Sequence, residues 1–516
     1  MERRIRTLSK VKWTKEQEGA INLRGQVLVS AAAGSGKTAV LVERLIRRIT
    51  CSEEKVDVDR FLVVTFTKAA AAEMRERVGK ALDESIFRET DPAELERLLQ
   101  QRSLLYRANI TTLHSFCLDL LKQYFYELEL DPAFRIIDEA EGALLQQEVL
   151  EELLEEKYAQ GDEEFHTLVD AFSTDRDDGP LLEHILRLYE FAMSQPQPFQ
   201  WLKDLSRGYY WDDLNSIVES PWGKAVISGL QDQVGEIVSL FETALRIAQE
   251  PGGPSQYLEV LQNDLERTQL LCQALKEGDW QKIEQAYAQA ADFPTLPRGG
   301  GRKKGEQNKE EEERSKRLRE ESKSFRDEGK KKMERIGNIF ALPLQEQLPL
   351  LERMGGIIGT LAQITEEFVK EYSLAKSKRN VLDFSDLEHL ALKLLEKDGE
   401  ITPLCEKLKE HFAEILVDEY QDINPVQEKL LQLVSREEPP NLFMVGDIKQ
   451  SIYRFRMADP SLFLKKYQEF PHYVPGQEPP QPNLVIDLNQ NFRSRSEIIQ
   501  CINYLFYQIM TEGAGE

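Results

Sequence analysis

One short stretch of this chain, AAAGSGKT at residues 31–38, restricts its fold more than any other. It follows the apolar run QVLVS and precedes the helix-like run TAVLVERLIRRI. Small residues between a strand and a helix let backbone N–H groups close around phosphate oxygens, and the helix dipole favours their negative charge. The pattern usually begins with glycine, whereas this chain has Ala31 at that position. We therefore expect a phosphate-binding P-loop between a strand and a helix.

The P-loop pattern predicts a role for its residues. Lys37 is expected to reach the β- and γ-phosphates, and Thr38 to offer its hydroxyl to Mg²⁺. The predicted cofactors are therefore ATP and Mg²⁺. The residues expected to hold the nucleotide are Ala31, Ala32, Ala33, Gly34, Ser35, Gly36, Lys37 and Thr38.

The segment ILVDEYQD at residues 415–422 supplies the acidic partner that a P-loop requires. Asp418 and Glu419 come directly after a short apolar run, so we place them at the end of a strand. Asp418 is expected to hold Mg²⁺ through water, and Glu419 to position and deprotonate the attacking water. Two acids after a strand, taken alone, more often mark a helix start. Their coupling to a P-loop favours the metal ligand and the base.

Five short apolar runs indicate an α/β fold. Because their apolarity is continuous and does not alternate, we expect strands buried on both faces of a parallel sheet. The runs are residues 26–32, 60–66, 414–419, 441–447 and 483–489. Residues 118–380 are instead rich in Leu, Glu, Gln and Lys, with helical spacing such as that of Leu150, Leu153 and Leu154. We expect a large all-helical insertion there.

Within that insertion, residues 298–334 are heavily charged and of low complexity. An exposed helix or a disordered loop is the expected structure, and a DNA-contacting arm is the alternative. Residues 471–482 are rich in proline and are expected to form a linker.

Composition excludes several classes of protein. No run approaches the roughly 20 apolar residues of a membrane span, so no membrane association is expected. The five cysteines are scattered without CxxC spacing, which is typical of reduced thiols in a cytoplasmic protein. The net charge of −24 argues against a general nucleic-acid coat protein but leaves room for a local basic groove.

Eight segments, read in order, resemble the motif series of superfamily 1 helicases of the UvrD, PcrA, Rep and RecB type. They are WTKEQ (13–17), AAAGSGKT (31–38), VTFTKAAAAEMRERV (64–78), ITTLHSFC (110–117), VLDFSDLE (381–388), ILVDEYQDIN (415–424), MVGDIKQSIYRFRMADP (444–460) and LNQNFRSRSEII (488–499). Adjoining stretches are most similar to the AddA family of helicase–nuclease subunits. Eight motifs in order are far more specific than any one of them.

The resemblance implies further nucleotide-site residues. Gln17 matches the glutamine that reads adenine, since a carboxamide can donate to and accept from its edge. Phe492 matches an aromatic residue that stacks on adenine. Gln450 matches a γ-phosphate sensor, and Arg493 matches an arginine that reaches the γ-phosphate from a second motor domain. With Lys37 and Glu419, Gln450 and Arg493 complete the catalytic residues that the resemblance implies.

The resemblance also implies a DNA-binding side, in which phosphate contacts combine with aromatic platforms for the bases. The matching residues are Phe66, Thr67, Thr112, His114, Tyr453, Phe455 and Arg456. Position 455 is often Trp in the family, and Phe offers a smaller stacking face. A lone histidine such as His114 is more often a core or capping residue than a DNA contact.

The implied architecture is a RecA-like P-loop NTPase core interrupted by the helical insertion, followed by the start of a second RecA-like domain. Residues 1–120 and 381–470 are expected to form domain 1A, residues 121–380 the helical domain 1B, and residues 471–516 the incomplete start of domain 2A. The chain resembles the N-terminal part of AddA. Motifs V and VI and the nuclease domain are not among its residues, so exonuclease activity is implied only for the full-length family member.

Three functions remain open at this point. The resemblance implies an ATP-dependent DNA helicase or translocase of 3′→5′ direction, acting on single- and double-stranded DNA in double-strand-break repair by homologous recombination. It also implies a heterodimer with an AddB-like partner. The first alternative is a truncated fragment that binds ATP and single-stranded DNA without helicase turnover. The second is a P-loop ATPase that is not a motor, which leaves the motifs around Phe66, Tyr453 and Arg493 unexplained.

Overall fold

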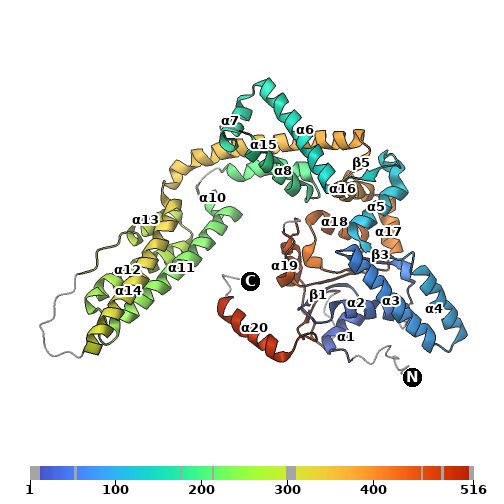
Figure 1. Ribbon diagram of the computed structural model, residues 1–516, viewed down its shortest axis with the longest axis horizontal. Helices are drawn as coiled ribbons and strands as arrows, with labels where there is room; N and C mark the ends of the chain where they lie inside the picture. Colours follow the sequence, from blue (N-terminus) through green and yellow to red (C-terminus); the bar gives the residue numbers. More distant parts are fainter. Residues whose placement is uncertain are drawn as a thin grey trace. The chain divides into compact units, whose positions relative to one another are not determined.

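The computed structural model describes residues 12–50, 55–174, 177–211, 214–297, 309–454, 457–477 and 482–510. Its central feature is a six-stranded sheet whose paired strands are all parallel, in the order β10-β1-β9-β8-β2-β3. Figure 1 labels β1 and β3 of this sheet and the helices beside it. The prediction of an α/β fold with a parallel sheet is confirmed. The strands are β1 (Gln26–Ala31), β2 (Phe61–Thr65), β3 (Asn109–Thr112), β8 (Glu414–Val417), β9 (Leu442–Gly446) and β10 (Asn483–Leu488).

The chain divides into two compact units. The first holds the described residues up to Leu205 together with Thr360–Phe506, and the second is built on Ser206–Gly359. Around the sheet, the first unit places α1 (Lys15–Asn22), α2 (Lys37–Thr50), α3 (Lys68–Arg88), α4 (Pro92–Leu104), α5 (Leu113–Tyr124), α16 (Phe384–Leu395), α17 (Pro403–His411), α18 (Pro425–Val434), α19 (Pro460–Glu469) and α20 (Ser496–Ile509). Two pairs of short strands accompany them, β4 (Arg135–Ile136) with β5 (Val381–Leu382) and β6 (Glu396–Lys397) with β7 (Glu400–Ile401).

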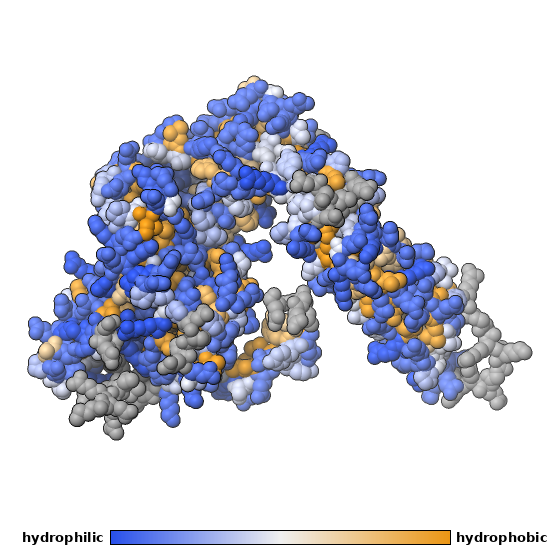
Figure 2. Space-filling model, turned by 180° about the vertical axis from the view of Figure 1, so that it is seen from behind, coloured by the Kyte–Doolittle hydropathy of each residue, from blue (hydrophilic) through white to orange (hydrophobic). Residues whose placement is uncertain are grey.

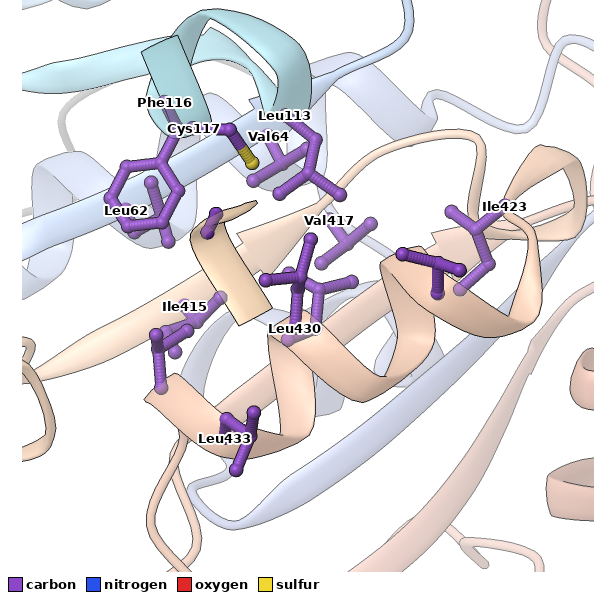
Figure 3. Packing of buried hydrophobic residues seen from close by; sticks show 14 of the residues in the cluster. Leu62, Val64, Leu113, Phe116, Cys117, Ile415, Val417, Ile423, Leu430 and Leu433 are labelled. Carbon is purple, nitrogen blue, oxygen red and sulfur yellow. The ribbon is translucent and has the colours of Figure 1, made fainter. Parts of the chain in front are cut away.

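Helices cover both faces of the sheet. On one face, Leu62 and Ile415 pack in a cluster with Phe116 of α5 and Leu430 of α18 (Figure 3). The neighbouring Val63 points the opposite way and packs in a second cluster with residues of α1 to α4. Since successive side chains of a strand alternate between faces, a strand between two helical layers must be apolar at every position. This explains the continuous apolar runs in the sequence.

The last strand of the sheet comes from a segment that we assigned to a second domain. Residues 471–516 were expected to begin domain 2A, but β10 pairs with β1 from Gln26 opposite Asn483 to Ala31 opposite Leu488. The strand therefore belongs to this sheet, and that part of the prediction is corrected. The physical reason is that the buried backbone of β1 needs hydrogen-bond partners on both sides, and β9 supplies them on one side and the apolar strand β10 on the other.

The long middle of the chain is almost wholly helical, as predicted. In the first unit it forms α6 (Glu139–Gln160), α7 (Glu163–Phe172), α8 (Gly179–Met193) and α9 (Pro198–Leu205). In the second unit it forms α10 (Leu214–Glu219), α11 (Pro221–Gln249), α12 (Leu258–Glu277), α13 (Trp280–Ala290) and α14 (Lys309–Ile336). The long helix α15 (Leu344–Lys378) runs from the second unit into the first.

The charged segment is not simply an exposed helix. Residues 309–336 form α14, and one side of this helix is buried against α11. The Ser322 hydroxyl donates to the Ala244 carbonyl at 2.9 Å, and Arg326 Nε donates to Asp264 Oδ2 at 2.6 Å. Gly329 lies so close to Phe241 that a Cβ would come within 2.3 Å of its ring. Residues 298–308 of the charged segment lie outside the described residues.

The face of the molecule seen in Figure 2 is largely hydrophilic, with hydrophobic residues in small groups. Among the residues that the structure describes, no helix combines the length and apolarity needed to cross a membrane.

A buried ion pair joins the sheet to the helices on one face. Arg44 of α2 and Glu414 of β8 are both buried, and Arg44 Nε donates to Glu414 Oε1 at 2.9 Å. Arg44 Nη1 also donates to the Ala20 carbonyl of α1 at 2.6 Å, and its guanidinium lies 4.1 Å from the centroid of the Phe443 ring. One side chain thereby holds α1, α2 and two strands together.

Removing the carboxylate from this pair should destabilise the sheet unit strongly. We expect Glu414→Ala to lower the free energy of unfolding by about 3–5 kcal/mol, because it leaves a buried guanidinium without its counter-charge. Urea unfolding followed by circular dichroism measures the change. Glu73→Ala is the matched control, since Glu73 pairs with Arg77 on an exposed helix surface and should change little. Equal stability of the two variants would contradict a stabilising role for the buried pair of Arg44 and Glu414.

Candidate nucleotide-binding site and adjoining groove

The P-loop forms where β1 passes into α2. Ala31 is the buried last residue of β1, and α2 begins at Lys37. Between them, Gly34 and Gly36 have φ angles of +73° and +87°, which glycine adopts without the steric cost that a Cβ brings. The loop therefore turns tightly and presents its backbone to the amino end of a helix, where phosphate oxygens bind well.

The loop that follows β10 lies beside the P-loop and donates hydrogen bonds to it. Because β10 pairs with β1, residues 489–494 leave the sheet beside the P-loop. The backbone N–H of Phe492 donates to the Gly34 carbonyl at 2.9 Å, and Asn491 Nδ2 donates to the Ala33 carbonyl at 2.7 Å. Asn491 was missed in the sequence, although it lies within a motif. Its contact depends on which strand neighbours β1, and the pattern carries no signal for that.

Lys37 and the acidic end of β8 meet directly. Lys37 Nζ lies 3.0 Å from Glu419 Oε2, and Glu419 adopts a left-handed backbone with φ +50°. Asp418 is the first residue of the turn after β8, residues 418–422, which we call the acidic turn. Its backbone N–H donates to the Val64 carbonyl of β2. Burial, together with the charge of Glu419, raises the pKa of Asp418 to about 6. A divalent cation beside Asp418 would offset that repulsion, so a carboxylate here and the Thr38 hydroxyl fit Mg²⁺.

Two further residues at this turn were not singled out in the sequence. Gln421 is fully buried, and its Nε2 donates to Glu419 Oε2 and to Asp422 Oδ2, each at 3.0 Å. Its Oε1 accepts the backbone N–H of Asp447, after β9, at 2.9 Å. Burial and the charge of Glu419 raise the pKa of Asp422 to about 6. Gln421 therefore links the acidic turn after β8 to the end of β9.

Gln17 is buried beneath the P-loop. Its Nε2 donates to the Ser35 carbonyl at 3.0 Å, and its Oε1 accepts the backbone N–H of Thr14 at the start of α1 at 3.0 Å. Gln17, Ser35 and Phe492 line the same pocket of 120 Å³, together with Asp487 and neighbouring residues. The structure thus brings the two expected adenine-binding residues together, while both ends of the Gln17 carboxamide also hold backbone.

The two other residues expected to contact the γ-phosphate lie at the surface. Gln450 is exposed, and its Nε2 donates to Asp447 Oδ2 at 2.6 Å. Arg493 is also exposed, and a Cβ on Gly34 would come within 2.9 Å of Arg493 Cβ. Arg493 is therefore next to the P-loop. Gln450 is held at the end of β9 by Asp447.

A groove of 390 Å³ opens at the carboxyl ends of β2, β3 and β8. Phe66, Thr112 and His114 from the expected DNA-binding set line it, and so do Asp418 and Glu419. Because the carboxyl ends of parallel strands share one edge of the sheet, residues after three different strands reach one groove. The groove adjoins the acidic half of the nucleotide site.

Two more of the expected DNA-binding residues, Thr67 and Tyr453, neighbour Phe66 of the groove. Phe66 and Tyr453 pack with ring centroids 4.4 Å apart. Thr67 accepts the backbone N–H of Ala70 at the start of α3, and Thr112 does the same for α5, so both residues cap helices. Phe455 and Arg456 lie outside the described residues.

His114 is fixed by a buried carboxylate. His114 Nε2 lies 3.0 Å from Glu388 Oε1, and Gln427 Nε2 donates to the same oxygen at 2.7 Å. Burial acts against the charge on Glu388, but its hydrogen bond and charge interaction with His114 outweigh that and lower its pKa. The His114 ring also meets the exposed Phe384 edge-on at 5.1 Å. His114 is therefore oriented at the groove wall.

Comparison with known proteins agrees with this geometry. The family model described as UvrD/REP helicase N-terminal domain matches residues 13–471. The A subunit of the ATP-dependent helicase/nuclease of Desulfitobacterium hafniense (strain DSM 10664 / DCB-2) is 61% identical over 98% of this chain and 36% of that protein. The proteins of the same name from Geobacillus kaustophilus (strain HTA426) and Pelotomaculum thermopropionicum are each 44% identical over 98% of this chain.

The chain spans 36% to 40% of the length of these curated relatives. The family match covers the P-loop, the acidic turn after β8 and the groove. The resemblance seen in the eight motifs is thereby confirmed, including the similarity to the A subunits of helicase–nucleases. The chain belongs to the UvrD/REP helicase family.

Proposed function

We propose that this chain binds Mg·ATP at the P-loop and uses it to drive movement along single-stranded DNA held in the adjoining groove. The observation that carries the proposal is the contact of Lys37 Nζ with Glu419 Oε2 at 3.0 Å. It brings the phosphate-binding lysine and the expected base to one point, although they are distant in sequence. Phe66, Thr112 and His114, which line the groove beside that point together with five acidic residues, are of the types that stack on bases or contact phosphates.

Each nucleotide-site residue then has a defined task. Bound Mg²⁺ supplies charge neutralisation of the phosphates. The Thr38 hydroxyl and the Asp418 carboxylate would hold it, and Lys37 would leave Glu419 for the β- and γ-phosphates. Glu419, freed from Lys37, would accept the proton of the attacking water. Arg493 and Gln450 would contact the γ-phosphate, and Gln17 and Phe492 the adenine.

The larger assembly is part of the same proposal. Residues 1–120 and 381–470 with β10 would form the nucleotide-binding domain, and residues 121–380 the helical insertion. The relatives are named as A subunits of an ATP-dependent helicase/nuclease, which supports a role in a cytoplasmic helicase–nuclease with an AddB-like partner. Such a complex would act in double-strand-break repair by homologous recombination. The 3′→5′ direction and a nuclease activity of the full-length protein rest on the family resemblance.

Hydrolysis of ATP that depends on single-stranded DNA is the first test. We expect the ATPase rate to rise when single-stranded DNA is added, and Lys37→Ala to abolish both the rate and detectable ATP binding. A coupled assay of ADP release, with binding of a fluorescent ATP analogue, measures the two quantities. Lys80→Ala is the control, because Lys80 is an exposed lysine of α3.

The alternatives give different results in the same assay. Binding of ATP with no hydrolysis in the presence of DNA would support the fragment without turnover. A rate of ATP hydrolysis that is well above background and that DNA does not change would support an ATPase that is not a motor.

Mg·ATP affinity should depend on pH through Asp418. Its pKa of about 6 means that the carboxylate is ionised above that pH and protonated below it. A protonated carboxyl cannot hold a cation, so Mg²⁺-dependent ATP affinity should fall about tenfold for each pH unit below about 6. Titrations at pH 5 to 8 check this. Asp418→Asn should remove most of the dependence and Asp422→Asn should keep it; identical profiles for the two variants would contradict the assignment.

The aromatic pair should carry much of the DNA affinity. Base–aromatic stacking is worth about 1–3 kcal/mol per base, so Phe66→Ala or Tyr453→Ala should each weaken binding to single-stranded oligothymidine by roughly 5- to 150-fold. Fluorescence anisotropy with a labelled oligonucleotide measures the change. Phe87→Ala is the control, because Phe87 is a highly exposed aromatic residue of α3 away from the groove. Unchanged affinity in both groove variants would exclude stacking there.

A further inference from the structure

The buried side chain of Gln421 joins the turn that holds Glu419 to the end of β9. It lies in the turn Tyr420–Asp422, directly after Glu419. Its Nε2 donates to Glu419 Oε2, which is also the oxygen that contacts Lys37 Nζ. Its Oε1 accepts the backbone N–H of Asp447, the residue after β9. A single carboxamide thus joins the acidic turn to the next strand of the sheet.

The contact continues from β9 towards the groove. Asp447 Oδ2 accepts Gln450 Nε2 at 2.6 Å, within the turn Ile448–Gln450 that follows β9. Three residues later, Tyr453 packs on Phe66 with ring centroids 4.4 Å apart. Gln421 is therefore a residue through which the turn holding Glu419 contacts the segment leading to Tyr453, and its backbone carbonyl also accepts the Ser451 hydroxyl at 3.5 Å.

The local packing leaves room for this contact and for little else. Gly446 ends β9, and a Cβ on it would lie 2.5 Å from Gln421 Oε1 and 3.1 Å from the ring of Phe463. Only a residue without a side chain lets β9 approach the Gln421 carboxamide so closely. Because these groups are closely packed, a displacement of Glu419 would also displace Gln421 and the end of β9.

A carboxamide suits this place better than other side chains. It donates two hydrogen bonds and accepts two without carrying charge. A lysine here would compete with Lys37 for Glu419, and a glutamate would place a third negative charge beside Glu419 and Asp422. Leucine fills a similar volume but makes none of the contacts.

We propose that Gln421 is the positioning residue that couples nucleotide binding to DNA binding. When Lys37 moves from Glu419 to a nucleotide phosphate, Glu419 keeps its contact with Gln421, whose carboxamide transmits the displacement to Asp447 and to the segment that leads to Tyr453 and its partner Phe66. The inference rests on the proposed function, since it requires that both ATP and single-stranded DNA bind. It adds a residue that touches neither ligand.

The test measures the coupling between the two ligands directly and requires no hydrolysis. The affinity of the chain for labelled oligothymidine is measured by fluorescence anisotropy, with and without a non-hydrolysable ATP analogue and Mg²⁺. For wild type we expect the analogue to change the dissociation constant by at least about fivefold, within the usual range of coupling between sites. For Gln421→Leu the ratio should fall to within about twofold of unity, while each ligand alone still binds.

Two further variants separate positioning from simple destabilisation. Gln432→Leu makes the same chemical change in α18, where the side chain contacts only Glu428 among the described hydrogen bonds, and it should keep the wild-type ratio. Gln421→Glu loses the donor to Glu419 when ionised and regains one when protonated. Its ratio, divided by that of wild type, should therefore recover as the pH is lowered, whereas the leucine variant should not recover. A structural role alone would lower melting temperature and both affinities without this pH-dependent recovery.

The outcomes are distinct from those of the proposed function. A wild-type ratio retained in Gln421→Leu, or a wild-type ratio of one while both ligands bind, overturns the inference and leaves the binding functions standing. Failure of wild type to bind ATP or oligothymidine at all would overturn the proposed function itself.

Discussion

The parallel register of the six strands is the constraint on which the rest of the structure depends. All carboxyl ends lie at one edge, so the loops after β1, β8, β9 and β10 gather there although they are far apart in sequence. The P-loop follows the second strand of the sheet, β1. On one side it meets the loop after β10, and towards the other lie the acidic turn after β8 and the end of β9. The candidate site at this edge is therefore built from the carboxyl ends of several strands and the loops that follow them.

Charge at that edge is balanced by few groups. Glu419 shares one oxygen between Lys37 and Gln421, and burial together with the charge of Glu419 raises the pKa values of both Asp418 and Asp422. Two carboxyls with pKa values of about 6, close to a single lysine, form a site that gains from an added cation. Phosphate binding would draw Lys37 away from Glu419, so under the proposed function nucleotide binding would change the contacts of the acidic turn.

Much of the fold followed from the sequence because its signals are local. The apolar runs at β1, β2, β8, β9 and β10 are continuous, and each became a buried parallel strand. β3 escaped notice because Asn109–Thr112 is short and polar at three of its four positions. The neighbour of β1 could not be predicted, because an apolar run does not say which strand edge it will meet. The buried side of α14 could not be predicted either, because the polar residues Ser322 and Arg326 and the small residue Gly329 contribute to it.

The residues of the candidate site also fall into two groups, those that a sequence pattern indicated and those that it did not. The sequence led us to expect Lys37, Asp418 and Glu419 at one site because each stands in a pattern with a chemical purpose, and the structure places Lys37 in contact with Glu419. Gln421 and Asn491 were not, because their contacts reach backbone atoms of distant segments. Residues whose partners are main-chain atoms leave no complementary residue type in the sequence. They can be found only once the strand order is known.

Hydrogen–deuterium exchange of the full chain, with and without Mg²⁺ and a non-hydrolysable ATP analogue, tests the central claim most directly. A nucleotide held at the shared edge should protect the backbone amides of three segments together, residues 32–38, 418–422 and 489–494. Protection of the P-loop without the other two would contradict a composite site. Protection at none of them would place the nucleotide elsewhere.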